Sequence, residues 1–345
     1  MRPYMKLNRI LILSALAGSL ISPVTIAETS IGGYGELHYN NLDKNGTDFA
    51  EIDFHRFVLF VAHDFNDKIR FFSEVELEHA LVADTVDGSN PGEYELEQAY
   101  IEMDLSDSST LKTGLFLIPV GIINETHEPP TFYGVERNPV EKNIIPATWW
   151  EGGAMYSSHM DNGISYDLAI HSGLFNIDGD IRGGRQKVAE SNADSLAYTA
   201  RIKYTGIAGL ELAASANVQT DLSQGTGAAG DAEGATLLET HIIYSTGGLK
   251  LTALHASWDV KIDKDASKET QDGTLLEVSY KLNDKWGVFA RQNSWSNVDT
   301  EEKKQSDFGF NYWPHEDVVY KVDFQSQNAD AGNADGFNLG VGFQF

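Results

Sequence analysis

The chain of 345 residues contains no cysteine, so disulfide bonds contribute nothing to its stability, which must come from elsewhere. It is also poor in basic residues, with 25 Lys and Arg against 51 Asp and Glu, which gives a net charge of −26. Such an acidic surface excludes nucleic acid as an expected partner, because the phosphate backbone would be repelled.

The chain also lacks an apolar run long enough for a membrane helix, which needs roughly 20 residues. Its most apolar stretch is the short segment Ile10–Ile21, which three basic residues precede and the small residues of Thr25-Ile26-Ala27 follow. This order is typical of a cleaved secretory signal. We therefore expect a signal peptide at residues 1–27 and a mature chain at 28–345, with a net charge of −29 because the signal carries three bases and no acid.

Catalytic and metal-binding signatures are missing as well. The sequence has no G-x-S-x-G or H-E-x-x-H motif, and its ten histidines are scattered without an H-x₃-H spacing. We therefore predict no catalytic residues, no metal site and no cofactor, and the chain is not expected to be an enzyme.

What the mature chain does show is a rhythm of runs of about ten residues, in which apolar and polar residues alternate between turn residues. Alternation of this kind is typical of strands whose two faces meet different surroundings. Sixteen such runs are found, at residues 30–40, 49–64, 69–82, 94–105, 111–118, 149–158, 164–174, 196–205, 210–220, 236–245, 249–259, 274–282, 286–296, 306–313, 317–327 and 336–345.

The connections between these runs alternate between short and long. The short ones, such as Asn66-Asp67-Lys68 and 314–316, carry residues that tolerate tight turns, whereas the long ones are polar. This alternation predicts an all-β fold, a sixteen-stranded antiparallel transmembrane β-barrel of the outer membrane with short periplasmic turns and long extracellular loops. A soluble β-sandwich, the competing architecture, would not require it and would be unusually large for one domain.

The final run alternates most regularly, with Phe337, Leu339, Val341, Phe343 and Phe345 separated by small or polar residues. A terminal aromatic residue such as Phe345 resembles the signal that bacterial barrel-assembly machinery reads, so we expect that machinery as a partner. Outer-membrane lipid and lipopolysaccharide are expected partners of the outer surface. The acidic loops either bind divalent cations that bridge lipopolysaccharide or are simply solvated.

The longest connection, residues 119–148, holds five of the nine prolines, which stiffen an irregular segment. A barrel of sixteen strands leaves an aqueous channel. We therefore expect this loop to fold inward and constrict the channel, with an external lid or an oligomer contact as the alternatives. Its candidate constriction residues are Glu125, Glu128, Glu136, Arg137, Glu141 and Lys142.

The start of this loop resembles a known family. Residues 112–121 read K-T-G-L-F-L-I-P-V-G, which is similar to the K-x-G-x-F-x-x-P-x-G pattern of the phosphate-selective porin O/P family. The resemblance implies a sixteen-stranded channel, a homotrimer, with its third loop constricting the pore. Phosphate selectivity in that family rests on a ladder of arginines and a cluster of lysines, for which this chain offers few counterparts.

Residues at alternate positions of a strand face opposite sides, so the parity of a position indicates which side it faces. Charged positions should face the pore, because a charge facing the lipid midplane costs about 2–4 kcal/mol. The charged side chains assigned to the lumen on this basis are Arg70, Glu74, Glu76, Glu78, Glu102, Asp104, Arg201, Lys203 and Arg291. Arg56 shares the parity of Phe54 and Val58, so it needs a β-bulge to avoid lipid. Acidic rings favour cations in a pore, unless each acid is paired with a base on another strand.

Together these features predict an outer-membrane porin for passive diffusion of small hydrophilic solutes and ions, general or weakly cation-preferring. An anion- or phosphate-selective porin is the first alternative. An outer-membrane enzyme and a loop-based receptor or adhesin are the others.

Overall fold

The computed structural model describes residues 28–86, 88–89, 91–177, 179–226, 232–262, 267–297, 302–328 and 333–345, so the predicted signal peptide lies outside the described residues. Sixteen strands are present: β1 (Glu28–Lys44), β2 (Thr47–Asn66), β3 (Ile69–Glu78), β4 (Tyr94–Ser106), β5 (Ser109–Leu117), β6 (Trp150–His159), β7 (Ile164–His171), β8 (Ala197–Tyr204), β9 (Leu210–Gln219), β10 (Ala232–Thr246), β11 (Leu249–Ile262), β12 (Ser267–Lys281), β13 (Trp286–Ser296), β14 (Lys303–His315), β15 (Val318–Asn328) and β16 (Ala334–Gln344).

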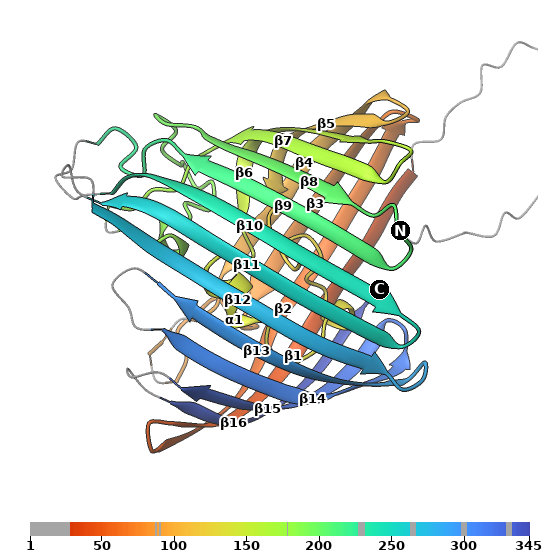
Figure 1. Cartoon of the computed structure of the whole chain (residues 1–345), viewed down its shortest axis with the longest axis vertical. Coiled ribbons are helices and arrows are strands. Elements are labelled where there is room, and N and C mark those ends of the chain that lie inside the picture. Colours follow the sequence, from red (N-terminus) through yellow and green to blue (C-terminus); the bar gives the residue numbers. More distant parts are fainter. Residues whose placement is uncertain are drawn as a thin grey trace, which may run out of the picture.

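Each strand pairs antiparallel with its neighbours in sequence, and β1 pairs with β16 to close the barrel (Figure 1). Reciprocal hydrogen bonds between Gly33 and Phe345, at 3.0 and 2.9 Å, extend this closure beyond the end of β16. Closure leaves no strand edge unpaired, so the backbone satisfies its own hydrogen bonds without water. The predicted fold class and all sixteen predicted runs are therefore confirmed, although β12 begins at Ser267 rather than at residue 274.

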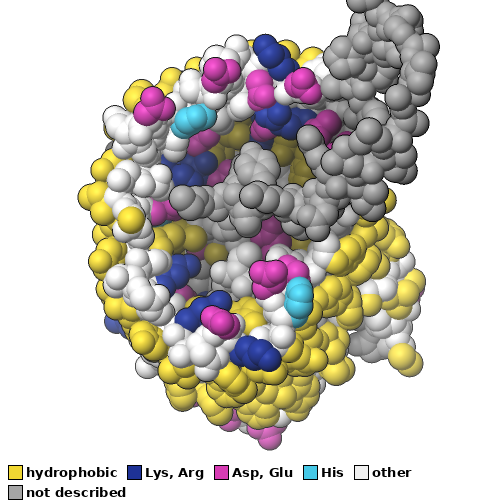
Figure 2. All heavy atoms as spheres, turned by 90° about the vertical axis from the view of Figure 1, so that its right-hand side faces the viewer, with side chains coloured by type: hydrophobic (Ala, Val, Ile, Leu, Met, Phe, Trp, Pro, Cys, Tyr) yellow, Lys and Arg dark blue, Asp and Glu magenta, His cyan; other side chains and the backbone are white. Residues whose placement is uncertain are grey.

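The apolar residues of the alternating pattern lie on the outer wall of the barrel. Large apolar side chains exposed there include Leu168, Ile170, Ile202, Leu251, Leu276, Val278, Phe308 and Phe324. Viewed from the end where both termini lie, apolar side chains cover the outside while charged ones surround the opening (Figure 2). Among the described residues, no helix is both long enough and apolar enough to cross a bilayer.

Toward the loop end, the polarity of the two strand faces reverses on β11. Leu254, Trp258 and Val260 point inward and are buried, whereas the outward-facing His255 and Asp259 are exposed. Simple alternation of lipid-facing apolar and lumen-facing polar residues therefore holds for only part of this strand. Toward the loop end, the inner surface of β11 is instead apolar, and loops pack against it.

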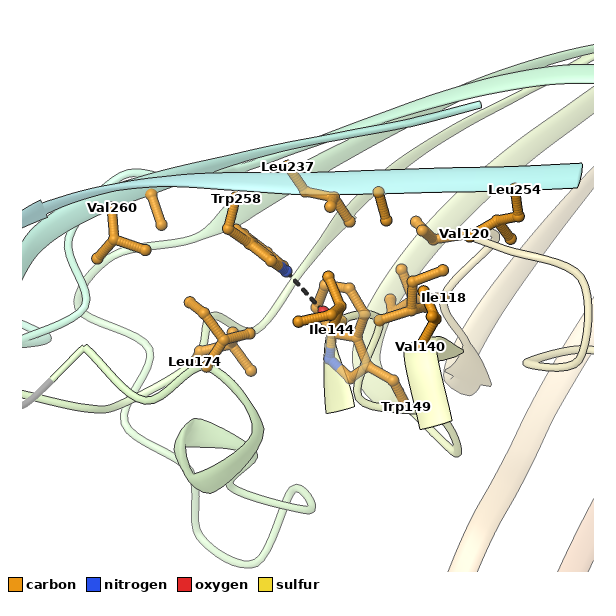
Figure 3. Packing of buried hydrophobic residues seen from close by; sticks show 14 of the residues in the cluster. Ile118, Val120, Val140, Ile144, Trp149, Leu174, Leu237, Leu254, Trp258 and Val260 are labelled. Carbon is orange, nitrogen blue, oxygen red and sulfur yellow. Dashed lines mark hydrogen bonds between the residues drawn. The ribbon is translucent and has the colours of Figure 1, made fainter. Parts of the chain in front are cut away.

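Two loops fill this part of the interior. We name residues 118–149, which join β5 to β6, loop three, and residues 172–196, which join β7 to β8, loop four. Their buried side chains, those of the wall and Leu222 from the connection between β9 and β10 form an inner apolar cluster (Figure 3). It includes Phe116, Ile118, Val120, Val140, Ile144, Ile145, Trp149, Leu174, Ile181, Leu222, Leu237, Leu254, Trp258, Val260 and Leu275.

Loop three contains a 3₁₀ turn, η1 (Pro129–Thr131), and one short α-helix, α1 (Pro139–Asn143), which begins for local reasons. Asn138 caps it by accepting a hydrogen bond from the Glu141 N–H at 2.9 Å, and Pro139 occupies the first turn, where its missing N–H costs nothing. The helix packs so closely on β12 that a Cβ at Gly273 would lie 2.8 Å from Val140. Glycine at this position lets the loop pack against the wall.

Trp258 joins loop three to the wall through both burial and a hydrogen bond, which leads to a stability prediction. The side chain is fully buried, and its indole N–H donates to the Ile144 carbonyl at 2.8 Å. Trp258→Ala should lower the free energy of unfolding by about 3–5 kcal/mol, and Trp258→Phe by about 1–3 kcal/mol through the unpaired carbonyl. Denaturant unfolding in detergent measures both. Trp286→Phe on the outer wall is the control, and an equal loss there would contradict the assignment.

Candidate constriction site

Loop three crosses the lumen and is anchored on strands around the barrel. Its first part contacts β8 and β3, where Arg201 donates to Glu125, and His127 lies 3.4 Å from Glu74. Its middle part contacts the opposite wall, where the Val135 N–H donates to Asp323 on β15 at 2.6 Å. The loop therefore spans the interior rather than covering the outside.

The ends of loop three are fixed by buried polar groups. The side chain of Asn124 donates to the carbonyls of Ile118 and Trp149, at 2.8 and 2.9 Å, and accepts from the Trp149 N–H at 2.7 Å. Glu141 is fully buried and accepts from the N–H groups of Ile122 and Ile123 at 2.6 and 2.8 Å. Burial raises the pKa of Glu141, and the hydrogen bonds it accepts oppose that rise. Glu141 is thus a structural group of the loop rather than a channel-lining one.

Between loop three and the β1–β4 wall lies a cavity of about 220 Å³, which we name the eyelet. Its charged and histidine lining residues are Glu36, His38, His55, Arg56, Glu78, His79, Glu95, Glu97, Glu136, Arg137, Lys142, Arg182, Arg185 and Lys187. A second cavity of about 540 Å³, the vestibule, lies on the loop side of the eyelet. Both cavities are lined by His55, His79, Glu136, Arg137 and Lys142, so they are contiguous.

The eyelet has two walls of opposite charge. The loop wall carries Arg137 and Lys142 of loop three and Arg182, Arg185 and Lys187 of loop four. The barrel wall carries Glu36, Glu78, Glu95 and Glu97 from β1, β3 and β4. This arrangement sets up an electric field across the cavity.

Loop four brings its arginines to the eyelet by bonding to the backbone of loop three. Arg182 donates to the Lys142 carbonyl, and Arg185 donates to the carbonyls of Pro146 and Thr148 at 3.2 and 2.7 Å. Burial, together with the positive charges of Arg185 and Arg137, lowers the pKa of Arg182. Burial also lowers the pKa of Lys142. The basic groups of this wall therefore lie buried and close to one another, which makes their charged forms less favourable than in water.

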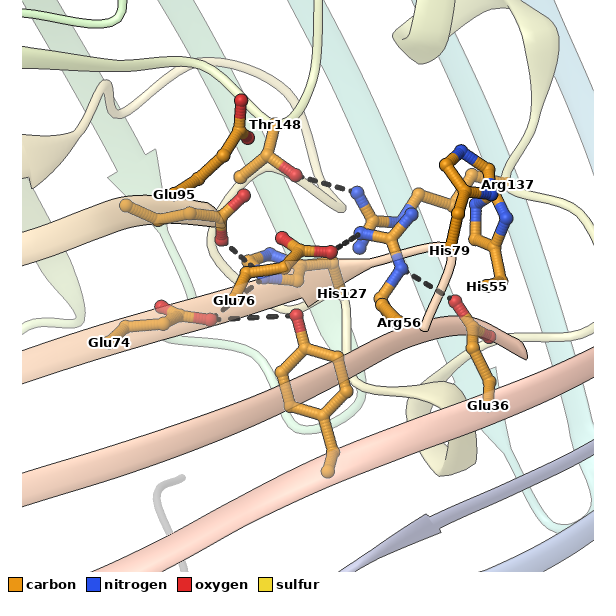
Figure 4. A network of polar contacts seen from close by, with 12 residues as sticks. Glu36, His55, Arg56, Glu74, Glu76, His79, Glu95, His127, Arg137 and Thr148 are labelled. Carbon is orange, nitrogen blue, oxygen red and sulfur yellow. Dashed lines mark hydrogen bonds and ion pairs between the residues drawn. The ribbon is translucent and has the colours of Figure 1, made fainter. Parts of the chain in front are cut away.

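Arg56 points into the lumen from β2 (Figure 4). It shares a face with Val58, which is fully buried and pairs with Tyr34 on β1 and Glu76 on β3, so the predicted need for a bulge to keep Arg56 from lipid is wrong: this face of β2 is the luminal one. A bulge does follow toward the loop end, where the pairing of β1 with β2 passes from Glu36↔Arg56 to His38↔Asp53, so β2 contains one extra residue there. Arg56 then forms ion pairs with Glu36 at 2.9 Å and Glu76 at 3.2 Å. Consecutive residues His55 and Arg56 both line the eyelet as a result.

The acidic face predicted on β3 points inward, but only Glu78 lines the eyelet. Glu74 and Glu76 are almost completely buried beneath loop three. Glu74 accepts from Gln98 at 2.6 Å, and Glu76 pairs with Arg56. The alternative of local pairing therefore describes these two acids better than an open acidic ring.

Most of the remaining predicted pore charges are also paired. Arg70 bonds to Glu102 at 2.7 Å and to Asp104, near the turn end of the barrel. Arg291 on β13 bonds to Asp307 at 3.0 Å.

On β8, Arg201 bonds to Asp167 at 2.8 Å as well as to Glu125, and Lys203 shares the parity of Arg201. Burial raises the pKa of Glu125, but the charge of Arg201 outweighs this and holds that pKa below its usual value.

Among the predicted loop-three residues, Glu136, Arg137 and Lys142 line the eyelet, whereas the half-buried Glu128 does not. Loop four was missed at the sequence level, although three bases within six residues of an acidic chain are a usable signal.

A relative from Aquifex aeolicus (strain VF5) is 33% identical over 337 residues, covering 86% of this chain and 74% of that protein, which is described as an uncharacterized protein. The chain belongs to the family of this Aquifex protein. No family model matches the sequence.

Solved structures with the same fold are outer-membrane porins and channels. The anion-selective porin of Comamonas acidovorans superposes with a TM-score of 0.68 at 12% identity, covering 92% of this chain and all of that one. The outer-membrane channel DcaP of Acinetobacter baumannii gives 0.63 at 12% identity, covering 94% and 99%. Salmonella typhi OmpF, in complex with daunomycin, gives 0.62 at 11% identity, covering 92% and 97%. The chain therefore has the porin fold.

Proposed function

We propose that this protein is an outer-membrane porin through which small hydrophilic solutes and ions diffuse passively with weak charge selectivity. The observation that carries the proposal is the eyelet, a cavity lined by charged side chains that adjoins a larger vestibule inside a closed barrel. Its lining holds six Lys and Arg residues against five Glu residues, so the two signs nearly balance. The porin fold and the predicted signal peptide support the outer membrane as its location.

Stepwise conductance of the refolded mature protein in a planar bilayer tests this function directly. Reversal potentials in a salt gradient should lie near zero, because the acidic and basic groups of the eyelet nearly balance and neither sign of ion is strongly favoured. A folded barrel without conductance would contradict the porin proposal and favour an enzyme, a receptor or an adhesin. The weak cation preference expected from the acidic face loses support, because Glu74 and Glu76 are sequestered beneath loop three.

Anion selectivity is a second candidate because the loop wall is basic. The Nε and Nη2 atoms of Arg137 are buried, and neither has a hydrogen-bond partner among the described residues. A guanidinium with free donors suits a carboxylate or a phosphate. The resemblance to the phosphate-selective porin O/P family supports the same candidate, for which block of the conductance by added phosphate is the distinguishing observation.

Charge variants of the two walls should shift selectivity in opposite directions. Neutralising the loop wall with Arg137→Gln and Lys142→Gln should raise the cation-to-anion permeability ratio severalfold. Neutralising the barrel wall with Glu78→Gln and Glu95→Gln should lower it, because the opposite wall then dominates. Reversal potentials measure both changes. Lys304→Glu, a change at the exposed rim outside both cavities, is the control, and an equal shift there would show that surface charge, not the eyelet, sets selectivity.

Assembly and partners follow from the same proposal. One solved structure with this fold, OmpT of Vibrio cholerae, is described as a trimer form. We expect a homotrimer here, with lipid and lipopolysaccharide on the rest of the apolar outer wall. The exposed Phe345 at the end of the chain is available to the barrel-assembly machinery. Light scattering of the detergent-solubilised protein measures the oligomeric state, and a monomer would contradict this expectation.

A further inference from the structure

Three histidines gather where the vestibule narrows into the eyelet. His38 lies on β1, His55 on β2, and His79 directly follows β3. The rings of His38 and His55 stack with their centroids 4.7 Å apart, and those of His55 and His79 meet edge to face at 5.5 Å. Figure 4 shows His55 and His79 next to each other beside Arg137. Diffusion of solutes does not by itself require imidazoles in mutual contact.

Carboxylates complete this cluster. Asp53 Oδ2 lies 2.9 Å from His55 Nδ1 and 2.8 Å from His79 Nδ1, so one oxygen atom serves both rings. Glu136 Oε1 of loop three lies 3.0 Å from His38 Nδ1. Candidate ligand atoms of Asp53, His55 and His79 all lie within 4.8 Å of one another, as do those of His38, His55 and Glu136. His55 belongs to both triads.

The local backbone is shaped to bring these groups together. Asp53 and His55 are two residues apart on β2 and therefore share a face, and the bulge beside them lets both His55 and Arg56 line the cavity. His79 adopts a left-handed conformation, with φ at +53°, and its N–H donates to the His55 carbonyl at 3.2 Å. This conformation, uncommon for a residue other than glycine, turns the chain just after β3.

We name the junction of the vestibule and the eyelet the neck. We propose that the neck binds one transition-metal ion of the zinc class, held by Asp53, His55 and His79, and that the bound ion reduces conduction. His38 and Glu136 lie within reach as alternative ligands. Imidazole nitrogens select zinc, copper and nickel, whereas calcium and magnesium prefer sites made of oxygen alone. Three protein ligands leave a coordination position free for water, and both cavities give the ion access to His55 and His79.

A further carboxylate, that of Glu36, holds the ring of His38 in place. Glu36 Oε2 lies 3.1 Å from His38 Nε2, so the two ring nitrogens of His38 contact carboxylates of Glu36 and Glu136. Outer partners of this kind hold a ligating ring in place and are typical of metal sites. Conduction responds because the ion adds positive charge to the neck and occupies the junction of the two cavities.

Calorimetric titration of the intact purified protein with zinc chloride tests the site itself. We expect one ion bound per chain, and binding at least about tenfold weaker in the double variant His55→Asn/His79→Asn. His241→Asn is the matched control, because His241 also contacts two glutamates, Glu239 at 2.7 Å and Glu211 at 3.2 Å, but lies outside this cluster. Unchanged zinc binding in the double variant, or calcium binding of equal strength, would overturn the proposed site.

Conductance measurements test the second half of the proposal, which rests on the proposed channel function. Zinc should reduce the wild-type conductance at concentrations at which calcium and magnesium have no effect, and the double variant should resist this block. Zinc that binds without altering the current would show that the site does not regulate conduction. If the wild-type protein forms no channels, the proposed porin function fails, and the titration still decides whether the metal site exists.

Discussion

A disulfide should form almost completely when Val135→Cys in loop three is combined with Gly340→Cys on β16. A Cβ atom at Gly340 would lie 3.6 Å from the Cβ of Val135, within the range of natural disulfides. The two positions are far apart in sequence, so the cross-link joins them only if loop three reaches the far wall of the barrel. Non-reducing electrophoresis of the oxidised protein measures the cross-link as a shift that reductant reverses.

The chain is well suited to this experiment because it has no native cysteine to compete. The matched control pairs Val135→Cys with Leu339→Cys, one residue away on β16 but facing outward, 39% exposed. This pair should remain reduced. Equal cross-linking of both pairs would indicate a mobile loop, and no cross-linking of either would contradict the anchored position of loop three.

The barrel itself was predictable from the sequence because its signal is repeated sixteen times. Alternating polarity and the short–long rhythm of connections are local properties, and one misjudged strand end does not disturb the rest. The prediction of where β12 begins fails for an instructive reason. The strands β10 to β12 continue toward the loops, where the polarity of their faces reverses, as at Trp258 and Asp259.

The candidate site was predictable only in part. Strand parity gives the direction of Glu74 and Glu76 but not the loop that covers them, because the contact between His127 and Glu74 joins residues far apart in sequence. The histidine cluster was invisible as a motif for the same reason. Its members come from β1, from β2 and from the residue directly after β3, and a one-residue bulge in β2 lets His55 line the eyelet beside Arg56.

Excision of loop three should raise the single-channel conductance at least about threefold, because a barrel of sixteen strands otherwise leaves a wide aqueous channel. Residues 121–146 can be replaced by a short glycine-serine linker, since the Ile118 N–H and the Trp149 carbonyl already meet at 3.0 Å. The β5–β6 ladder, which runs up to the Leu117↔Trp150 pair, remains intact. Planar-bilayer recording measures the change, and retained heat-modifiable migration on gels shows that the barrel has folded.

Excision also uncovers the apolar wall around Leu237, Leu254 and Trp258, so a milder variant is needed beside it. Asp323→Ala removes the acceptor of the Val135 N–H and releases only the middle of the loop. It should increase open-channel noise and make loop three accessible to protease, with a smaller rise in conductance than excision gives. A folded excision variant with unchanged conductance would mean that loop three does not set the width of the channel, and loop four, whose arginines line the same eyelet, would then be the constriction.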